Sequence, residues 1–231
     1  MVDCKGALVA YFKQHLPALH KEYEWRIPVI DGLRYGGKTD YHSTVGFKKD
    51  LTEKWEKADL AARYALAVTI VSSWGGVRGN RAETIEAYVN ELAAGIPRTP
   101  LKGVASYSKI FSISNPDTYA IYDARVAACL VAIQYNANVR NGIAFNYIAG
   151  RNNTTGNTQT RKGFVYEAPF KKTALLDKGW TDVERDKTYE TYLDLMTSCL
   201  AHFPENKLYD LEMVLFSRAV TECAEAMRRM I

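Results

Sequence analysis

Apolar residues recur at helical spacing along most of this chain, and this periodicity constrains the fold more than any other feature. Stripes that repeat every three or four residues predict amphipathic helices packed around a shared core. The expected helices span residues 3–23, 50–70, 81–94, 106–113, 182–203 and 208–230, with one more beginning near residue 123. No series of strands is strong enough to support a sheet, so we predict an all-α, compact multi-helix fold.

Glycine and proline mark where several of these helices stop. The first stripe is interrupted near Pro17, because a proline inside a helix lacks the amide hydrogen and clashes with the preceding turn. Residues 25–48 are rich in Gly, Pro and polar side chains, and they predict an extended excursion before a helix that begins at Asp50. Three glycines within residues 72–80 end that helix, and Gly95 ends the next one.

The size and composition fit one globular domain, residues 1–231, or two lobes that share one core. The hydrophobic fraction of 47% and the charged fraction of 24% exclude wholesale disorder. Residues 1–12 contain no long apolar run, so we predict neither a signal peptide nor a membrane span. We expect a monomeric, cytoplasmic protein.

The cysteines and histidines predict no metal and no cofactor. Cys4, Cys129, Cys199 and Cys223 lie far apart and form no CxxC pair, which argues against zinc and against an iron–sulfur cluster. Cys129 and Cys223 fall within apolar helical patterns and are expected to be reduced, buried thiols. The histidines are scattered without an HExxH pairing, so a metal hydrolase is a poor interpretation.

Residues 96–132 say most about function. Two prolines and Gly103 predict a tight entry into a short helix that carries Lys109. Residues 115–117, Asn-Pro-Asp, predict a turn, and Asp123 stands where the following helix begins. The order is therefore helix, turn, helix, with an aspartate at the opening of the second helix.

Asp123 is the first candidate for chemistry. An aspartate at this position accepts backbone N–H bonds and complements the helix dipole, a contribution of about 1 kcal/mol, so one interpretation is a purely structural N-cap. A fixed carboxylate that faces a cleft can also stabilise developing positive charge or orient a water molecule. The two roles are compatible, because the cap holds the carboxylate in place.

Lys109 is the second candidate. Taken alone it is most simply a solvated helix lysine. A lysine whose pKa is lowered by burial or by a neighbouring charge can instead be an amine nucleophile. The sequence leaves both interpretations of this residue open.

The order of these features resembles the helix-hairpin-helix DNA glycosylase superfamily, and most closely the proteins described as 8-oxoguanine DNA glycosylase-like. The matching residues are Gly103-Val104-Ala105, Lys109, Pro116 and the stretch 119–126. The resemblance implies that the hairpin turn binds DNA phosphate through backbone amides, that Asp123 is the essential acid, and that Lys109 attacks the sugar C1′ to form a Schiff base. Ala105 stands where the hairpin usually has a second glycine.

A basic, polar loop spans residues 136–172. It is rich in Asn, Gly and Thr, and six basic residues against one acidic residue give it a net charge of +5, compared with +4 for the whole chain. Such a stretch is either a solvated surface loop or a contact for DNA phosphates. The residues expected at the DNA are Gly103, Val104, Ala105, Lys102, Arg151, Arg161 and Lys162.

These observations favour an enzyme, a DNA glycosylase that excises a damaged or modified base from double-stranded DNA. Asp123 is then essential, and Lys109 adds an AP-lyase step. The target base is flipped into a pocket with aromatic and polar walls; Trp74 is either a core tryptophan or one that stacks on a base. The expected biological role is DNA repair, and the alternative role is the excision of modified bases from foreign DNA. The alternatives are a non-catalytic helix-hairpin-helix module that binds DNA, and a helical protein-interaction domain.

Overall fold

The computed structural model describes residues 3–230 and is mostly α-helical, which confirms the all-α prediction. The α-helices are α1 (Cys4–His15), α2 (Leu19–Glu22), α3 (Tyr41–Lys57), α4 (Leu60–Val68), α5 (Ala82–Ala93), α6 (Val104–Ser114), α7 (Ala124–Asn136), α8 (Lys172–Asp177), α9 (Thr188–Leu200) and α10 (Leu208–Arg228). A π-helix, η2 (Thr69–Trp74), extends α4. Short 3-10 helices are η1 (Leu16–Ala18), η3 (Phe164–Tyr166), η4 (Ala168–Phe170) and η5 (Arg185–Lys187).

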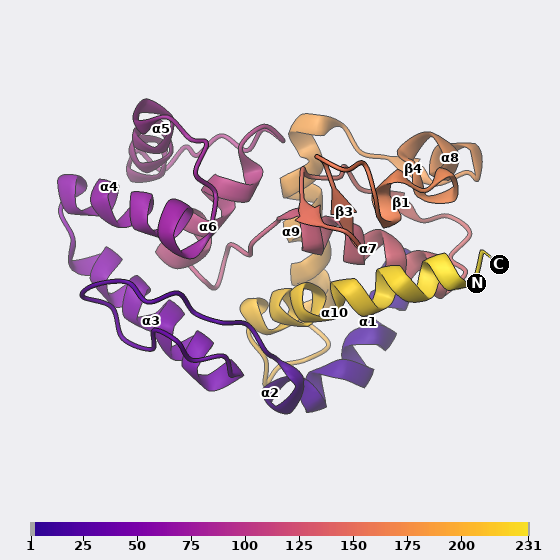
Figure 1. Ribbon diagram of the computed structural model, residues 1–231, viewed down its shortest axis with the longest axis horizontal. Helices are drawn as coiled ribbons and strands as arrows, with labels where there is room; N and C mark the ends of the chain where they lie inside the picture. The colour runs from indigo at the N-terminus through magenta and orange to yellow at the C-terminus, as the bar shows by residue number, and fades with distance from the viewer. Residues whose placement is uncertain (1–2, 231) are drawn as a thin grey trace.

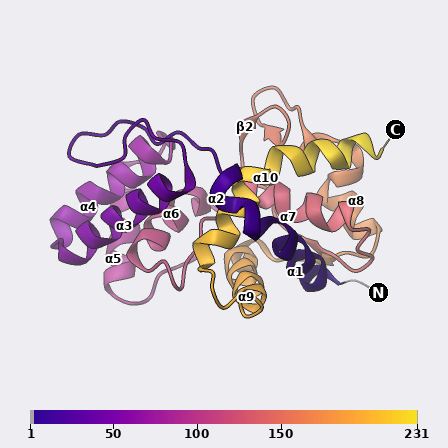
Figure 2. The same ribbon diagram turned by 90° about the horizontal axis from the view of Figure 1, so that it is seen from below.

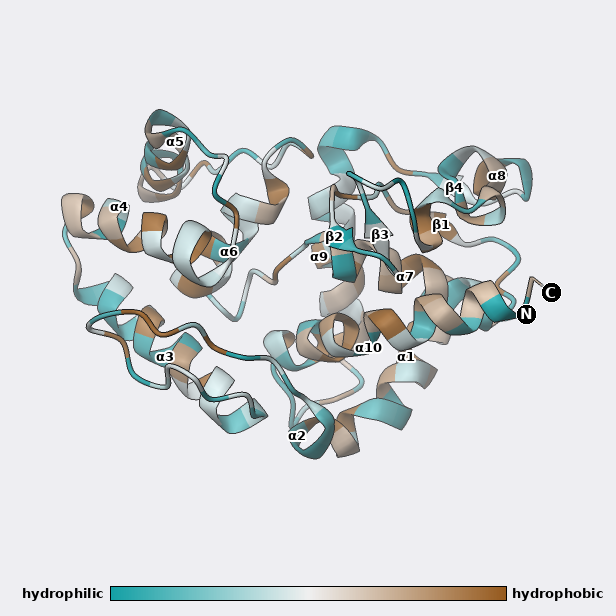
Figure 3. Ribbon diagram, in the orientation of Figure 1, coloured by the Kyte–Doolittle hydropathy of each residue, from teal (hydrophilic) through white to brown (hydrophobic). Residues whose placement is uncertain are grey.

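The few strands are two residues long and serve to fold the polar loop. β1 (Ile143–Ala144) pairs in parallel with β4 (Thr181–Asp182). β2 (Arg151–Asn152) and β3 (Gly156–Asn157) form an antiparallel hairpin, which is hydrophilic in Figure 3. Neither pair makes a layer of the fold.

The helices form two lobes around one continuous core (Figures 1 and 2). Helices α3 to α6 make one lobe, at the left in both views, and α1 with α7 to α10 makes the other. The connection from α6 to α7 crosses between the lobes, so Lys109 on α6 and Asp123 before α7 come from opposite sides of the boundary.

Helix α7 is the central helix of its lobe. All residues from Val126 to Gln134 are buried, and α10 packs along it. The alanines of α7 are small enough to let neighbouring backbones approach closely. The buried side-chain amide of Gln134 has hydrogen-bond partners. Gln134 donates to the carbonyls of Leu130 and Ile143 and accepts from the Ile143 amide at 2.7 Å.

Three helix boundaries differ clearly from the sequence prediction. The helix expected from residue 182 begins at Thr188, because β4 and η5 occupy residues before it. The other two differences come from capping aspartates. The helix expected from residue 50 begins at Tyr41, because the Asp40 carboxylate accepts from the Ser43 amide at 2.9 Å. The extended segment predicted over residues 25–48 is correspondingly shorter. The same predicted helix is broken in two where Asp59 caps α4 through the Ala62 amide at 2.8 Å. The expected break near Pro17 is confirmed, since α1 ends at His15.

The four cysteines are buried free thiols, as predicted for Cys129 and Cys223. Within residues 3–230, no helix combines the length and apolarity that crossing a membrane requires.

Candidate functional site

Asp123 is the N-cap of α7, as predicted. Its Oδ1 accepts hydrogen bonds from the amides of Arg125 at 2.9 Å and Val126 at 3.1 Å. Its Oδ2 accepts none from the residues that the structure describes. The cap therefore fixes one carboxylate oxygen and leaves the other free at the surface of a cavity.

Lys109 is buried, so its interpretation as a solvated helix lysine is wrong. The residue is 7% exposed, and its Nζ donates to the Ala105 carbonyl at 2.6 Å. Burial lowers the pKa of the Lys109 amine; the charges of Asp123 and Glu212 oppose this shift, and Lys48 adds to it. A lowered pKa is what an amine nucleophile requires.

An inner pocket of about 210 Å³ contains both candidates. Aromatic rings form much of its wall, and a buried ion pair lies among them. Its walls include Trp25, Trp74, Phe216, Tyr23, Lys48 and Glu212. Trp74 also packs on Phe47, with ring centroids 5.7 Å apart. Trp74 is thus partly buried against the core and also forms a wall of the pocket.

An outer groove of about 700 Å³ adjoins the inner pocket. It runs between the glycine-rich segment 75–80, the hairpin turn 103–106 and the loop 148–151. Lys109 and Asp123 line both the inner pocket and the outer groove. They stand where the pocket opens into the groove.

The hairpin turn has the backbone of an anion site. Gly103 has φ +89°, and a β-carbon there would lie 2.0 Å from the Tyr88 hydroxyl oxygen, so only glycine fits. Among residues 3–230, no acceptor takes a hydrogen bond from the amides of Gly103 or Ala105. Free amides at a helix N-terminus favour a bound phosphate.

The structure brings together only some of the expected DNA contacts. Gly103, Val104, Ala105 and Arg151 line the outer groove together with Arg78. The other three, Lys102, Arg161 and Lys162, are exposed but are not among the residues that line the groove.

The Lys48–Glu212 ion pair was missed by the sequence reasoning. Lys48 Nζ lies 2.7 Å from Glu212 Oε2, and the two side chains are only 12% and 4% exposed. Glu212 Oε1 accepts no hydrogen bond within the described part of the chain. Burial raises the pKa of Glu212, and Lys48 opposes that shift. The available signal was a glutamate inside the apolar stripe of the last helix.

Two aromatic rings hold the Arg125 guanidinium at a position that is electrostatically unfavourable for a cation. It lies in the first turn of α7, where the helix dipole repels positive charge, and makes no ion pair within residues 3–230. Its guanidinium carbon lies 4.9 Å from the Trp25 ring centroid and 5.0 Å from that of Phe216. All three residues line the inner pocket.

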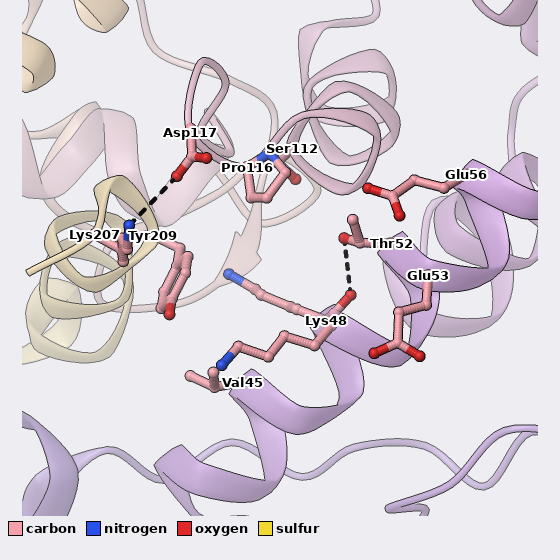
Figure 4. Close-up of a pocket in the computed structure, with 11 residues that line it drawn as sticks. Val45, Lys48, Thr52, Glu53, Glu56, Ser112, Pro116, Asp117, Lys207 and Tyr209 are labelled. Atoms are coloured by element: carbon pink, nitrogen blue, oxygen red, sulfur yellow. Dashed lines mark hydrogen bonds and ion pairs between the residues drawn. The ribbon is translucent and has the colours of Figure 1, made fainter.

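A further cavity of about 330 Å³ lies behind Lys48, which borders both it and the inner pocket (Figure 4). Its charges are mixed. Lys207 faces Asp117 with 3.9 Å between Nζ and Oδ1, and Glu53 and Glu56 project from α3. Because neither sign of charge dominates, the cavity favours no particular ligand.

Comparison with family models, with curated proteins and with solved structures found no match for this chain. Among the residues that the structure describes, no three His, Cys, Asp or Glu side chains are grouped to hold a metal ion.

Proposed function

We propose that this protein is a DNA glycosylase, which excises a damaged or modified base from double-stranded DNA and cleaves the resulting abasic site. The observation that carries the proposal is the shared position of Lys109 and Asp123. A buried amine and a fixed carboxylate both line the pocket and the groove that adjoins it. A flipped nucleotide requires this layout, with its base in the pocket and its backbone in the groove.

The outer groove supplies contacts for a nucleic-acid backbone. The free amides of Gly103 and Ala105 can donate to one phosphate, and Arg78 and Arg151 carry positive charge on the groove wall. Arg125 stands at the inner pocket, its guanidinium fixed by two rings. An unpaired cation there favours the phosphate next to an extruded nucleotide.

The inner pocket suits a base. Rings of Trp25, Trp74 and Phe216 offer apolar surface for stacking, as base-flipping enzymes require. Glu212 Oε1 is an acceptor without a protein partner in residues 3–230. It can accept hydrogen bonds from N–H groups on the edge of a bound base.

The side chains can carry out excision in one displacement. The Lys109 amine donates a hydrogen to the Ala105 carbonyl, and once it has lost its extra proton it has a lone pair for C1′ of the sugar. A C–N bond forms at C1′ as the glycosidic bond breaks, and the base leaves with the bonding pair. The base takes up one proton, which the new ammonium at Lys109 releases. The Asp123 carboxylate stabilises the positive charge that develops on the sugar. The sugar ring then opens, O4′ takes up a proton from water, and an iminium remains on Lys109. Loss of a C2′ proton breaks the C3′–O bond, and the strand leaves as a phosphate.

The test is a panel of duplexes, each with one modified base, assayed for abasic sites and for a borohydride-trapped complex. We expect release from at least one duplex, trapping by the wild type, and no trapping by Lys109→Gln. Asp123→Asn should bind the duplex and release the base more slowly, by about a hundredfold or more. DNA binding without release from any duplex would instead indicate a non-catalytic module, and equal activity of Asp123→Asn would overturn the proposal.

A further inference from the structure

A second basic hollow lies at the other end of α7 from Asp123. It has a volume of about 650 Å³ and is lined by residues that include Tyr135, Val139, Arg140, Lys178, Trp180 and Arg229. The 13 residues of α7 separate it from the N-cap by about 20 Å along the helix axis. This far hollow is on the side of β1, β4 and α8, at the right in Figure 1.

The far hollow carries one sign of charge. Its three cations come from three places: the loop after α7, the end of α8 and the end of α10, and no Asp or Glu is among the lining residues. The Arg140 and Lys178 side chains make no ion pair or hydrogen bond within residues 3–230. Arg229 is paired with Glu225, at 3.1 Å between Nε and Oε1, so the positive potential that favours an anion comes mainly from Arg140 and Lys178.

Neighbouring residues hold the side chains that line the far hollow in place. Lys178 Nζ lies 4.7 Å from the Tyr135 ring centroid, and Arg229 Nη1 donates to the Asn136 carbonyl at 2.6 Å. Trp180 lies directly against the backbone at Gly142, where a β-carbon would be 2.6 Å from its ring. The Thr181 amide also donates to the Gly142 carbonyl at 2.7 Å.

We propose that the far hollow binds backbone phosphates of a second nucleic-acid segment, separate from any duplex in the outer groove. The hollow is wide and open, and its cations are spread over three elements, which suits a row of phosphates better than one small anion. The exposed amides of Asn138 and Asn141 add hydrogen-bond donors. Helix α7 directs its N-terminus to the outer groove and its C-terminus to the far hollow, so the two sites lie about 20 Å apart along the helix axis and hold different phosphates. The protein then bridges two segments. This binding does not depend on base excision.

The chain's four tryptophans give a direct readout, because each indole N–H has one resonance in the spectrum of ¹⁵N-tryptophan-labelled protein. Trp180 reports on the far hollow, and Trp25 and Trp74 report on the inner pocket. Trp55 lines neither and serves as an internal reference. The labelled protein is titrated with an unmodified short duplex and, separately, with inorganic phosphate.

The test variant is Arg140→Ala/Lys178→Ala. Its matched control is Lys13→Ala/Arg185→Ala, which removes the same charge from exposed positions outside the hollow. We expect the duplex to shift the Trp180 resonance in the wild type and in the control. In the test variant, the affinity measured at Trp180 should fall roughly tenfold or more in 0.1 M salt, because two phosphate contacts are lost.

Three results would overturn the inference: a Trp180 resonance that does not move with duplex, one that moves only with inorganic phosphate, or one that moves equally in the test variant. A shift of Trp25 and Trp74 without Trp180 would contradict this inference and leave the proposed glycosylase standing. A shift of Trp180 alone would support the far hollow and show that the unmodified duplex places no base in the inner pocket.

Discussion

The side chain of Lys109 lies directly over Gly75, at the point where the π-helix η2 ends. A β-carbon on Gly75 would lie 2.6 Å from Lys109 Cδ and 2.9 Å from Cε, and also 2.8 Å from the Val71 carbonyl oxygen. These distances are too short for any side chain at position 75, because the backbone oxygen cannot move aside. Gly75 is therefore a positioning residue for the Lys109 amine.

Gly75→Ala should displace the Lys109 side chain from the junction of pocket and groove. We expect slower borohydride trapping with nearly unchanged DNA affinity, and a stability loss of about 1–3 kcal/mol from overpacking. Gly79→Ala is the matched control, since a β-carbon at Gly79 meets no atom within 4 Å and its φ is not positive. Equal trapping rates in the two variants would show that Gly75 does not position the amine.

Substitutions of Asp123 separate its cap from its chemistry. Asparagine caps a helix about as well as aspartate does, so Asp123→Asn should keep most of the stability, whereas Asp123→Ala should lose about 1 kcal/mol. Both should slow base release by about a hundredfold or more, because the carboxylate charge is absent. Thermal unfolding and single-turnover excision measure the two effects.

The control for Asp123 is Asp59, which caps α4 in the same way and lines neither the inner pocket nor the outer groove. Asp59→Ala should cost similar stability and leave base release unchanged. A loss of activity in Asp59→Ala as large as that in Asp123→Ala would mean that stability alone explains both.

The features that sequence could predict are local ones. Asp123 was identified as a cap because the cap depends only on the residues that follow it. The boundaries near Asp40 and Asp59 were missed, although they are caps too, because the Gly-rich composition and a continuous apolar stripe concealed them. Helical periodicity gave the all-α class but not the arrangement of the helices in two lobes.

Long-range features could not be predicted. The position of the Lys109 side chain depends on Gly75, which follows η2, and its pKa depends on Glu212 of α10; packing brings both residues to α6. The stacking of Arg125 on Trp25 and Phe216 likewise joins three separate segments. Charge in the sequence did not show which basic residues of the loop 136–172 share a surface. The structure puts Arg151 at the outer groove and Arg140 at the far hollow.

Stability should depend on pH through Lys109. Burial holds its pKa in the folded protein below the ordinary value of 10.5, so between these two pKa values the unfolded chain binds more protons than the folded one. The free energy of unfolding therefore rises with pH across that window and falls as the pH drops through it. Trapping should also become faster as the amine loses its proton.

Lys109→Met removes this dependence. At neutral pH the variant should be more stable than the wild type by about 1 kcal/mol, because an apolar chain replaces a buried amine, and the gap should shrink toward alkaline pH. Lys102→Met, at an exposed lysine, should show no such trend. Unfolding in denaturant at several pH values measures both. A gap independent of pH would mean that Lys109 keeps an ordinary pKa in the folded protein.

The Lys48–Glu212 pair should matter for both stability and base choice. Lys48→Met leaves a carboxylate buried without its partner and should cost about 3 kcal/mol, while the double variant Lys48→Met/Glu212→Gln should cost less than the sum of the single changes. Unfolding in denaturant measures this coupling. Glu212→Gln should also alter the relative rates at which different modified bases are released, because an amide presents one acceptor and one donor group where the carboxylate presents acceptors only.

Asp50 provides the control for Glu212, since its carboxylate is also nearly buried and paired, with Arg34 at 2.7 Å, but does not line the inner pocket. Asp50→Asn should lower stability without changing which bases are released. If Glu212→Gln lowers stability and leaves the order of preferred bases unchanged, the ion pair is structural and the base is recognised by other groups. If the order of preferred bases changes in Glu212→Gln and not in Asp50→Asn, Glu212 Oε1 contacts the edge of the flipped base.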